Sequence, residues 1–221
     1  MTRPHEDLQR HTPADHRPGG VPVTFAPGAW CAIDVVHTKA ERVDAGISAY
    51  ETLIEKARSS PLGVRVAAVL RSVNDRRVIA MVDIEGHAAF HHLQSSWDNH
   101  HLVAQRDDVA ESSTLGLYRV AASTGDAAID PESKDAYAFE HVALAPERVS
   151  ALAAAAAKAH GFRGVVVFGA DDDKGSIIVY HFGHAVDLDT FRASAEAQRI
   201  LGPVRADGET ISAVHPVRTF G

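Results

Sequence analysis

The 221-residue sequence contains a single cysteine, Cys31, and no long apolar run. One cysteine cannot form a disulfide within the chain or supply the thiolates of a metal cage, so we expect Cys31 to be a small core residue. No stretch approaches the ~20 apolar residues of a membrane-spanning helix, which argues against a membrane partner. The polar first 20 residues lack the apolar core of a secretory signal. We therefore expect a cytoplasmic protein.

Basic residues are also scarce relative to acidic ones. Lys and Arg number 22 and Asp and Glu 29, so the formal net charge is −7. Because binding to a phosphate backbone requires clustered Lys and Arg, this balance argues against a nucleic-acid partner. The sequence also lacks the glycine-rich dinucleotide fingerprint, the P-loop, the serine-hydrolase elbow and the H-E-x-x-H motif. These absences argue against the commonest nucleotide-binding, hydrolase and zinc-protease functions, and we predict no metal site.

Histidine, by contrast, is abundant, with 14 residues in the chain. Three of them lie in the first 28 residues, which also hold five of the ten prolines. This segment shows no apolar period, and its composition predicts a flexible N-terminal arm over residues 1–28.

The rest of the chain carries one pattern of elements twice. In the first half, β-branched runs and helical spacing predict, in order, strand, helix, strand, strand, helix and strand at 30–37, 40–57, 63–72, 76–84, 88–97 and 115–121. In the second half the same order is predicted at 137–144, 145–160, 164–170, 176–182, 188–201 and 211–217. The sequence ERVDA at 41–45 matches ERVSA at 147–151. We predict repeats over 29–121 and 137–221, joined by a small, polar linker over 122–136.

The order β-α-β-β-α-β is that of a ferredoxin-like unit, an antiparallel sheet with both helices on one face. The other sheet face also has to be covered. Two copies in one chain can cover it by packing their sheets together. The predicted fold class is therefore α+β, with two tandem ferredoxin-like repeats packed sheet to sheet as a dimeric α+β barrel within one chain.

One candidate site is the histidine-rich segment at 87–101. Neutral imidazole moves protons near neutral pH and an indole ring can stack on a flat substrate, so we predict His91 and His92 as catalytic and Trp97 as substrate-binding. The alternative is a solvated helix-to-loop segment in which the histidines are incidental.

A second candidate is a pair of polar residues inside apolar runs, Asp34 and His141, which we match to each other in the first strand of each half. A polar residue on a buried strand face is costly unless it is paired, so both are predicted as catalytic acid or base groups. Trp30, in the same run as Asp34, is predicted to bind substrate. The alternative, that this strand face meets solvent, stays open.

A third candidate ends the strand at 176–182. Alternation places Tyr180 and Phe182 on one face and His181 on the other. We predict His181 as a proton-transfer group and Tyr180 and Phe182 as substrate-binding residues. The alternative is that His181 is a hydrogen-bonded, partly buried strand residue.

The tandem arrangement resembles the dimeric α+β barrel superfamily and, within it, the antibiotic biosynthesis monooxygenase-like proteins, over residues 29–220. The resemblance implies an oxidoreductase, a monooxygenase that acts on a flat aromatic or polyketide-like substrate in secondary metabolism. It implies that no cofactor is required, although a transient reduced flavin is compatible with it. Oxygenases of this group usually carry Asn, then Trp four residues later, on the third strand, where this sequence has Ala80 and Ile84.

Two alternatives remain. The first is a haem-binding enzyme, of haem oxygenase, dehydratase or peroxidase-like type, with an axial histidine from segment 87–101. The resemblance to haem-degrading relatives makes His100 and His101 the candidate ligands. The second is a non-enzymatic ligand-binding or stress-related barrel. In each case the expected partner is a small hydrophobic or aromatic molecule, and a homodimer is the protein partner that the resemblance allows.

Overall fold

The computed structural model describes residues 19–60, 63–73, 75–95, 108–144, 146–171, 175–201 and 213–221. The first half contains β1 (Trp30–Thr38), α1 (Val43–Arg58), β2 (Ala67–Ser72), β3 (Arg77–Ile84), α2 (His87–Ser95) and β4 (Ala110–Gly125). The second half contains β5 (Ala136–Val142), α4 (Pro146–Ala156), β6 (Phe162–Ala170), β7 (Ser176–Phe182), α5 (Ala185–Ala193), α6 (Ala195–Leu201) and β8 (Ala213–Phe220). The order β-α-β-β-α-β therefore occurs twice, as predicted. The second helix of the second half is divided into α5 and α6.

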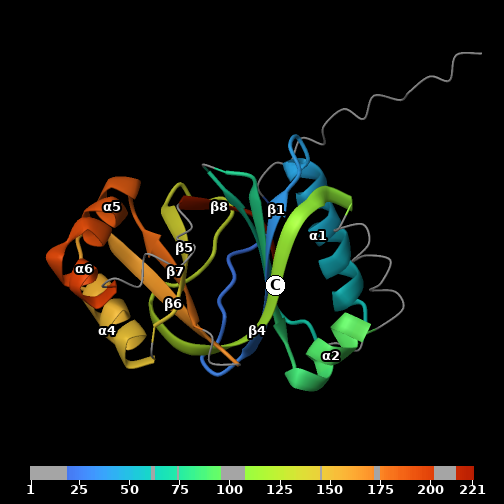
Figure 1. Ribbon diagram of the computed structural model, residues 1–221, viewed down its shortest axis with the longest axis horizontal. Helices are drawn as coiled ribbons and strands as arrows, with labels where there is room; N and C mark the ends of the chain where they lie inside the picture. The colour runs from blue at the N-terminus through green and yellow to red at the C-terminus, as the bar shows by residue number, and fades with distance from the viewer. Residues whose placement is uncertain are drawn as a thin grey trace, which may run out of the picture.

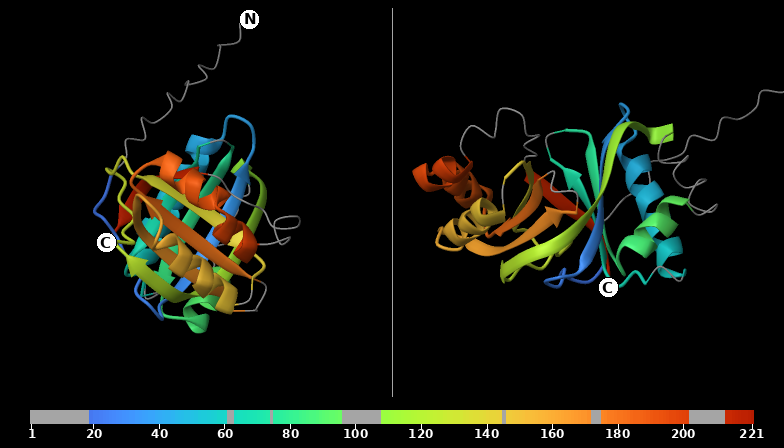
Figure 2. Two further views of the ribbon diagram at one scale, coloured as in Figure 1. Left: turned by 90° about the vertical axis from the view of Figure 1, so that its left-hand side faces the viewer. Right: turned by 60° about the horizontal axis from the view of Figure 1, so that its bottom comes forward.

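The eight strands in the described residues form one closed antiparallel barrel, in the order β1-β3-β2-β8-β5-β7-β6-β4. Each half contributes a four-stranded sheet in ferredoxin-like order, β4-β1-β3-β2 and β8-β5-β7-β6. The two sheets join edge to edge where β2 pairs with β8 and β4 pairs with β6. Helices α1 and α2 cover one side of the barrel and α4, α5 and α6 cover the opposite side (Figures 1 and 2). The predicted fold class is confirmed. In the described part of the chain, no helix has the length and apolar character needed to cross a membrane.

Strand β4 is longer than the predicted strand at 115–121. Its first part, Ala110–Arg119, pairs with β1, and its last part, Tyr118–Gly125, pairs with β6 of the other half. The residues at 121–125 are small or polar, so they carry no apolar signal. Their pairing depends on backbone hydrogen bonds, which are independent of side-chain polarity.

Strand alternation separates three apolar layers. In β1, Cys31 and Ile33 face the barrel interior, where they pack with the inward-facing residues of the other strands. Ala32 and Val36 face outward, into a layer beneath α1 and α2. A corresponding outer layer lies between the second sheet and α4, α5 and α6. The barrel interior is therefore a packed core and not a channel.

The segment 19–28, expected to belong to a flexible arm, is part of this core. Phe25 is 1% exposed, and its ring lies edge-on to Phe168 inside the barrel, with 5.6 Å between the ring centroids. Val23 pairs with Ile129 of the linker, and Gly19 forms a bridge with Arg218 of β8. The sequence pattern did not show this because the segment bonds to residues more than 90 positions away and lies among prolines.

We predict that Phe25→Ala lowers the free energy of unfolding by about 3–5 kcal/mol, because it leaves a cavity inside the barrel. Urea unfolding followed by circular dichroism measures the change. The matched control is Val21→Ala in the same segment, where the side chain is 56% exposed and the expected change is within about 0.5 kcal/mol. Equal stabilities of the two variants would contradict the placement of Phe25.

Candidate functional site

A carboxylate lies buried between the first sheet and its helices. Asp34 of β1 is 5% exposed, and its neighbours on the same strand face, Ala32 and Val36, belong to the layer beneath α1 and α2. The hydroxyl of Tyr50 on α1 donates a hydrogen bond of 2.8 Å to Asp34 Oδ2. Ala80 lies directly across the β1–β3 ladder from Asp34. The face of β1 that carries Asp34 is therefore buried and not solvated.

The residue that matches Asp34 in the second half is Glu140, not His141. Asp34 and Glu140 are each the fifth residue of the first strand of their repeat. Glu140 lies on the outward face with Ala138 and Val142, which belong to the layer beneath the second set of helices. The sequence comparison was wrong by one residue, and a shift of one residue moves a side chain to the opposite face of a sheet.

The two buried carboxylates have different partners. Glu140 is 1% exposed and faces Arg192 of α5, with 3.7 Å between Glu140 Oε1 and Arg192 Nη2. Within the described residues, neither carboxylate oxygen of Glu140 accepts a hydrogen bond. The charge of Glu140 is thus opposed by a guanidinium, whereas Asp34 accepts a hydrogen bond from a neutral phenol. Asp34 is the candidate base of this pair, because its carboxylate is buried and oriented by the Tyr50 hydroxyl.

His141 is half-buried on the barrel side of β5, opposite Ile177 of β7. The His141 side chain therefore lies on the other side of the sheet from Glu140 and Arg192. The role of His141 as an acid or base stays a prediction.

His181 of β7 is held at both ring nitrogens. Nδ1 lies 2.9 Å from the backbone oxygen of Asp126, and Nε2 lies 2.8 Å from Asp135 Oδ2. The ring also stacks on Tyr137, with 4.5 Å between centroids. Both partners accept hydrogen bonds, so both bonds form together when each ring nitrogen carries a proton. This arrangement fastens the linker to the second sheet, and the catalytic role of His181 stays a prediction.

Tyr180 and Phe182 lie on the opposite face of β7 from His181, as alternation predicted. Both are buried beneath the helices of the second half, where each ring contacts Phe191 of α5. That Tyr180 and Phe182 bind substrate in this layer stays a prediction.

A polar cluster forms around Trp30 at the other end of β1. The indole meets the ring of His87 edge-on at 4.7 Å, and the Arg119 guanidinium lies 5.5 Å from the indole centroid. His87 Nε2 lies 2.7 Å from Asp171 Oδ2, although the two residues come from different repeats. Sequence reasoning missed this His–Asp pair because no local motif connects positions 84 residues apart.

The remaining predicted residues belong to the histidine-rich segment. His91 and His92 are exposed on α2, and Trp97, His100 and His101 lie outside the described residues. Among the residues that the structure describes, no three His, Cys, Asp or Glu side chains come together as a metal site would require.

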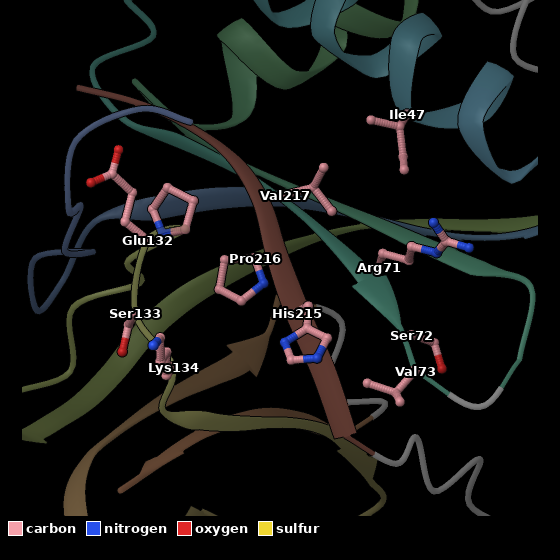
Figure 3. A pocket seen from close by; sticks show the side chains of 11 residues that line it. Ile47, Arg71, Ser72, Val73, Glu132, Ser133, Lys134, His215, Pro216 and Val217 are labelled. Atoms are coloured by element: carbon pink, nitrogen blue, oxygen red, sulfur yellow. The ribbon is translucent and has the colours of Figure 1, made fainter. Parts of the chain in front are cut away.

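A cavity of about 700 Å³ opens where the two repeats meet at β2 and β8 (Figure 3). This volume is within the range typical of small-molecule sites. The lining comes from α1, β2, the linker and β8, and consists of Ile47, Arg71, Ser72, Val73, Pro131, Glu132, Ser133, Lys134, His215, Pro216 and Val217. None of the predicted site residues that the structure describes lines it. The sequence gives no local signal for this cavity, because its walls come from positions scattered between 47 and 217.

A smaller cavity, of about 250 Å³, lies among α4, α5 and α6, and includes Lys158, His160, Asp187 and Phe191. In the described residues, the layers between sheets and helices are filled mainly by apolar side chains.

Solved structures with the same arrangement cover nearly the whole chain. An anthrone oxidase-like protein is 14% identical with a TM-score of 0.69, over 90% of this chain and 95% of that chain. A candidate monooxygenase from Fusobacterium nucleatum is 11% identical with a TM-score of 0.60, over 88% and 95% of the two chains. A monooxygenase-like protein from Listeria innocua is 13% identical with a TM-score of 0.50, over 86% and 94%. No protein-family model and no curated protein matches the sequence. The chain thus has the fold of these monooxygenase-like structures.

We predict that His181→Ala lowers the free energy of unfolding by about 2–4 kcal/mol, because it removes two hydrogen bonds and a stacked ring from the junction of linker and sheet. The matched control is His184→Ala, three positions later, where the side chain is exposed. Equal effects of the two substitutions in urea unfolding would show that the bonds of His181 contribute nothing to stability.

We predict that Cys31 does not react as a nucleophile. Complete burial raises the pKa of the Cys31 thiol well above its ordinary value, and the nearby charge of Asp83 raises it further. A higher pKa means less thiolate at a given pH. A disulfide reagent at about pH 8.5, the ordinary pKa of cysteine, should leave the native chain unlabelled and label one thiol per chain in concentrated guanidinium. Rapid labelling of the native protein would contradict this.

Proposed function

We propose that the protein is an oxygenase that acts on a flat aromatic substrate with an acidic phenolic or enolic hydroxyl, and that Asp34 is the base. The observation that carries the proposal is the buried Asp34–Tyr50 pair on the helix side of the first sheet. The fold shared with monooxygenase-like structures supports an oxidoreductase.

The position of Asp34 gives further support. Oxygenases that this chain resembles usually carry Asn on the third strand, where this chain has Ala80. Asp34 lies directly across the ladder from Ala80. Asp34 thus supplies a polar group on the same patch of sheet, from the neighbouring strand.

The proposed chemistry needs a base in apolar surroundings. Asp34 takes the hydroxyl proton, which leaves an electron-rich substrate anion that can pass an electron to O₂. Tyr50 orients the carboxylate through its hydrogen bond to Oδ2. The apolar neighbours of Asp34 on the same strand face, Ala32 and Val36, exclude water, which strengthens the interaction between the base and the hydroxyl.

Anthrone is a suitable test substrate because it tautomerises to a form with an enolic hydroxyl. Its oxidation to anthraquinone converts a methylene into a carbonyl and is a loss of four electrons. One O₂ accepts them, giving the carbonyl oxygen and one water, so the reaction consumes no other reductant. The proposal also includes two proton-transfer groups, His91 and His92. It includes two residues that contact the substrate, Trp30 and Trp97.

We predict that the purified protein consumes O₂ with anthrone and that Asp34→Asn lowers the rate at least about 100-fold, because the amide cannot accept the proton. Tyr50→Phe should lower it roughly tenfold by removing the orienting hydrogen bond. An oxygen electrode and the absorbance of the quinone measure the rate.

The matched control is Glu140→Gln, the same change at the equivalent buried position of the other repeat, which should keep the wild-type rate. An Asp34→Asn variant that folds and turns over at the wild-type rate would contradict the proposal. So would a wild-type protein that leaves anthrone and other polyphenols unoxidised. A Soret band in the purified protein, lost on replacing His100 or His101, would instead favour the haem alternative.

A further inference from the structure

We infer that the cavity between the two repeats is a second ligand site, one that takes a small organic anion with an apolar body, such as an aromatic carboxylate or sulfonate. Neither Asp34 nor Tyr50 lines this cavity. The inference does not depend on the proposed oxygenase function.

The cavity has a structural cause in β8. The register of β8 against β2 shifts between Val69 and Leu70, and Pro216 lacks the N–H of a regular strand residue. In the described part of the chain, β8 pairs with β5 only at Tyr137 and Ala138. The equivalent strands of the first repeat, β4 and β1, pair along the whole of β1. The pairing between β8 and β5 is therefore shorter than the pairing between β4 and β1. Linker residues 131–134 line the cavity beside it.

The polar walls carry more positive than negative side chains. Figure 3 shows Lys134 of the linker on one side of β8, Arg71 of β2 on the other side, and His215 between them. Glu132 is the acidic group of the lining, and Asp44 of α1 lies 3.5 Å from the Arg71 guanidinium at an exposed position. Within the lining, two permanent cations and a histidine thus stand against one carboxylate, and Asp44 outside the lining offsets part of the charge of Arg71. Lys134 and Arg71 are the groups that would contact the acidic group of an anion.

A buried hydroxyl provides a further polar contact. Ser72 is 2% exposed and lines the cavity, and within the described residues its Oγ forms no hydrogen bond. A buried hydroxyl without a partner is costly, and an oxygen of a bound anion would satisfy it.

Apolar side chains also line the cavity. Figure 3 shows Ile47 of α1 and Val217 of β8 above His215 and away from Lys134, with the Arg71 side chain below Ile47. Apolar and cationic side chains in one cavity of about 700 Å³ fit a ligand with an aromatic body and a single acidic group.

The test is a fluorescence titration with 8-anilinonaphthalene-1-sulfonate, which has both features. We expect saturable binding at this cavity, and we expect Arg71→Glu/Lys134→Glu to weaken that affinity roughly tenfold or more by reversing two exposed charges. N-phenyl-1-naphthylamine, which has the same rings without the sulfonate, should bind the wild type at least about tenfold more weakly if the cations recognise the acidic group.

Two controls make the test specific. Lys158→Glu makes the same kind of charge change at the smaller cavity and should leave the affinity unchanged. Asp34→Asn should also leave it unchanged, which separates this site from the proposed oxygenase site. Circular dichroism and thermal melting check that each variant is folded.

Non-saturable binding to the wild type would overturn the inference. So would equal affinities of the wild type and the folded double variant, or a loss of affinity in Lys158→Glu. Val73→Trp, which fills the cavity from an exposed position, gives an independent check: it should also weaken binding, and unchanged binding would overturn the inference.

Discussion

Hydrogen bonding between the edge strands of the two repeats is the constraint on which the rest of the structure depends. Each ferredoxin-like sheet alone would leave two unpaired edges and one uncovered apolar face. The pairings β2–β8 and β4–β6 remove all four edges and enclose the two inner faces as one core. Strand β4 makes this possible because it is long enough to pair with β1 along its first part and with β6 along its last part.

Closure of the barrel decides where chemistry can take place. The interior is filled by aliphatic and aromatic side chains, so a ligand can bind only outside the sheets or at the junctions between repeats. On the outer faces, the duplicated position has diverged: Asp34 accepts a hydrogen bond from Tyr50, while Glu140 faces Arg192. At the junctions, the β4–β6 pairing runs from Tyr118 to Gly125, whereas the β2–β8 junction lies beside a cavity. The two halves thus share a fold but carry different side-chain contacts at equivalent places.

The sequence was sufficient to predict the elements, their order and the sheet-to-sheet packing, because β-branched runs and helical spacing are local signals. It was not sufficient to fix which face of β5 carries the residue equivalent to Asp34, since alternation leaves a one-residue uncertainty that exchanged Glu140 for His141. It also missed the burial of Phe25 and the contact between His181 and Asp135, because both depend on partners distant in the sequence. Trp97, His100 and His101 lie outside the described residues and remain predictions.

The central claim is that the two repeats form one cooperative unit, since neither sheet is complete without the other. Hydrogen exchange measured by mass spectrometry at increasing urea concentrations tests this most directly, with amides of β1 reporting on the first repeat and amides of β7 on the second. Exchange of both strands at the same free energy of opening, with the same urea dependence, is the result that this account predicts. Exchange of one strand through an opening of clearly lower free energy, while the other stays protected, would show that the repeats unfold independently and would contradict it.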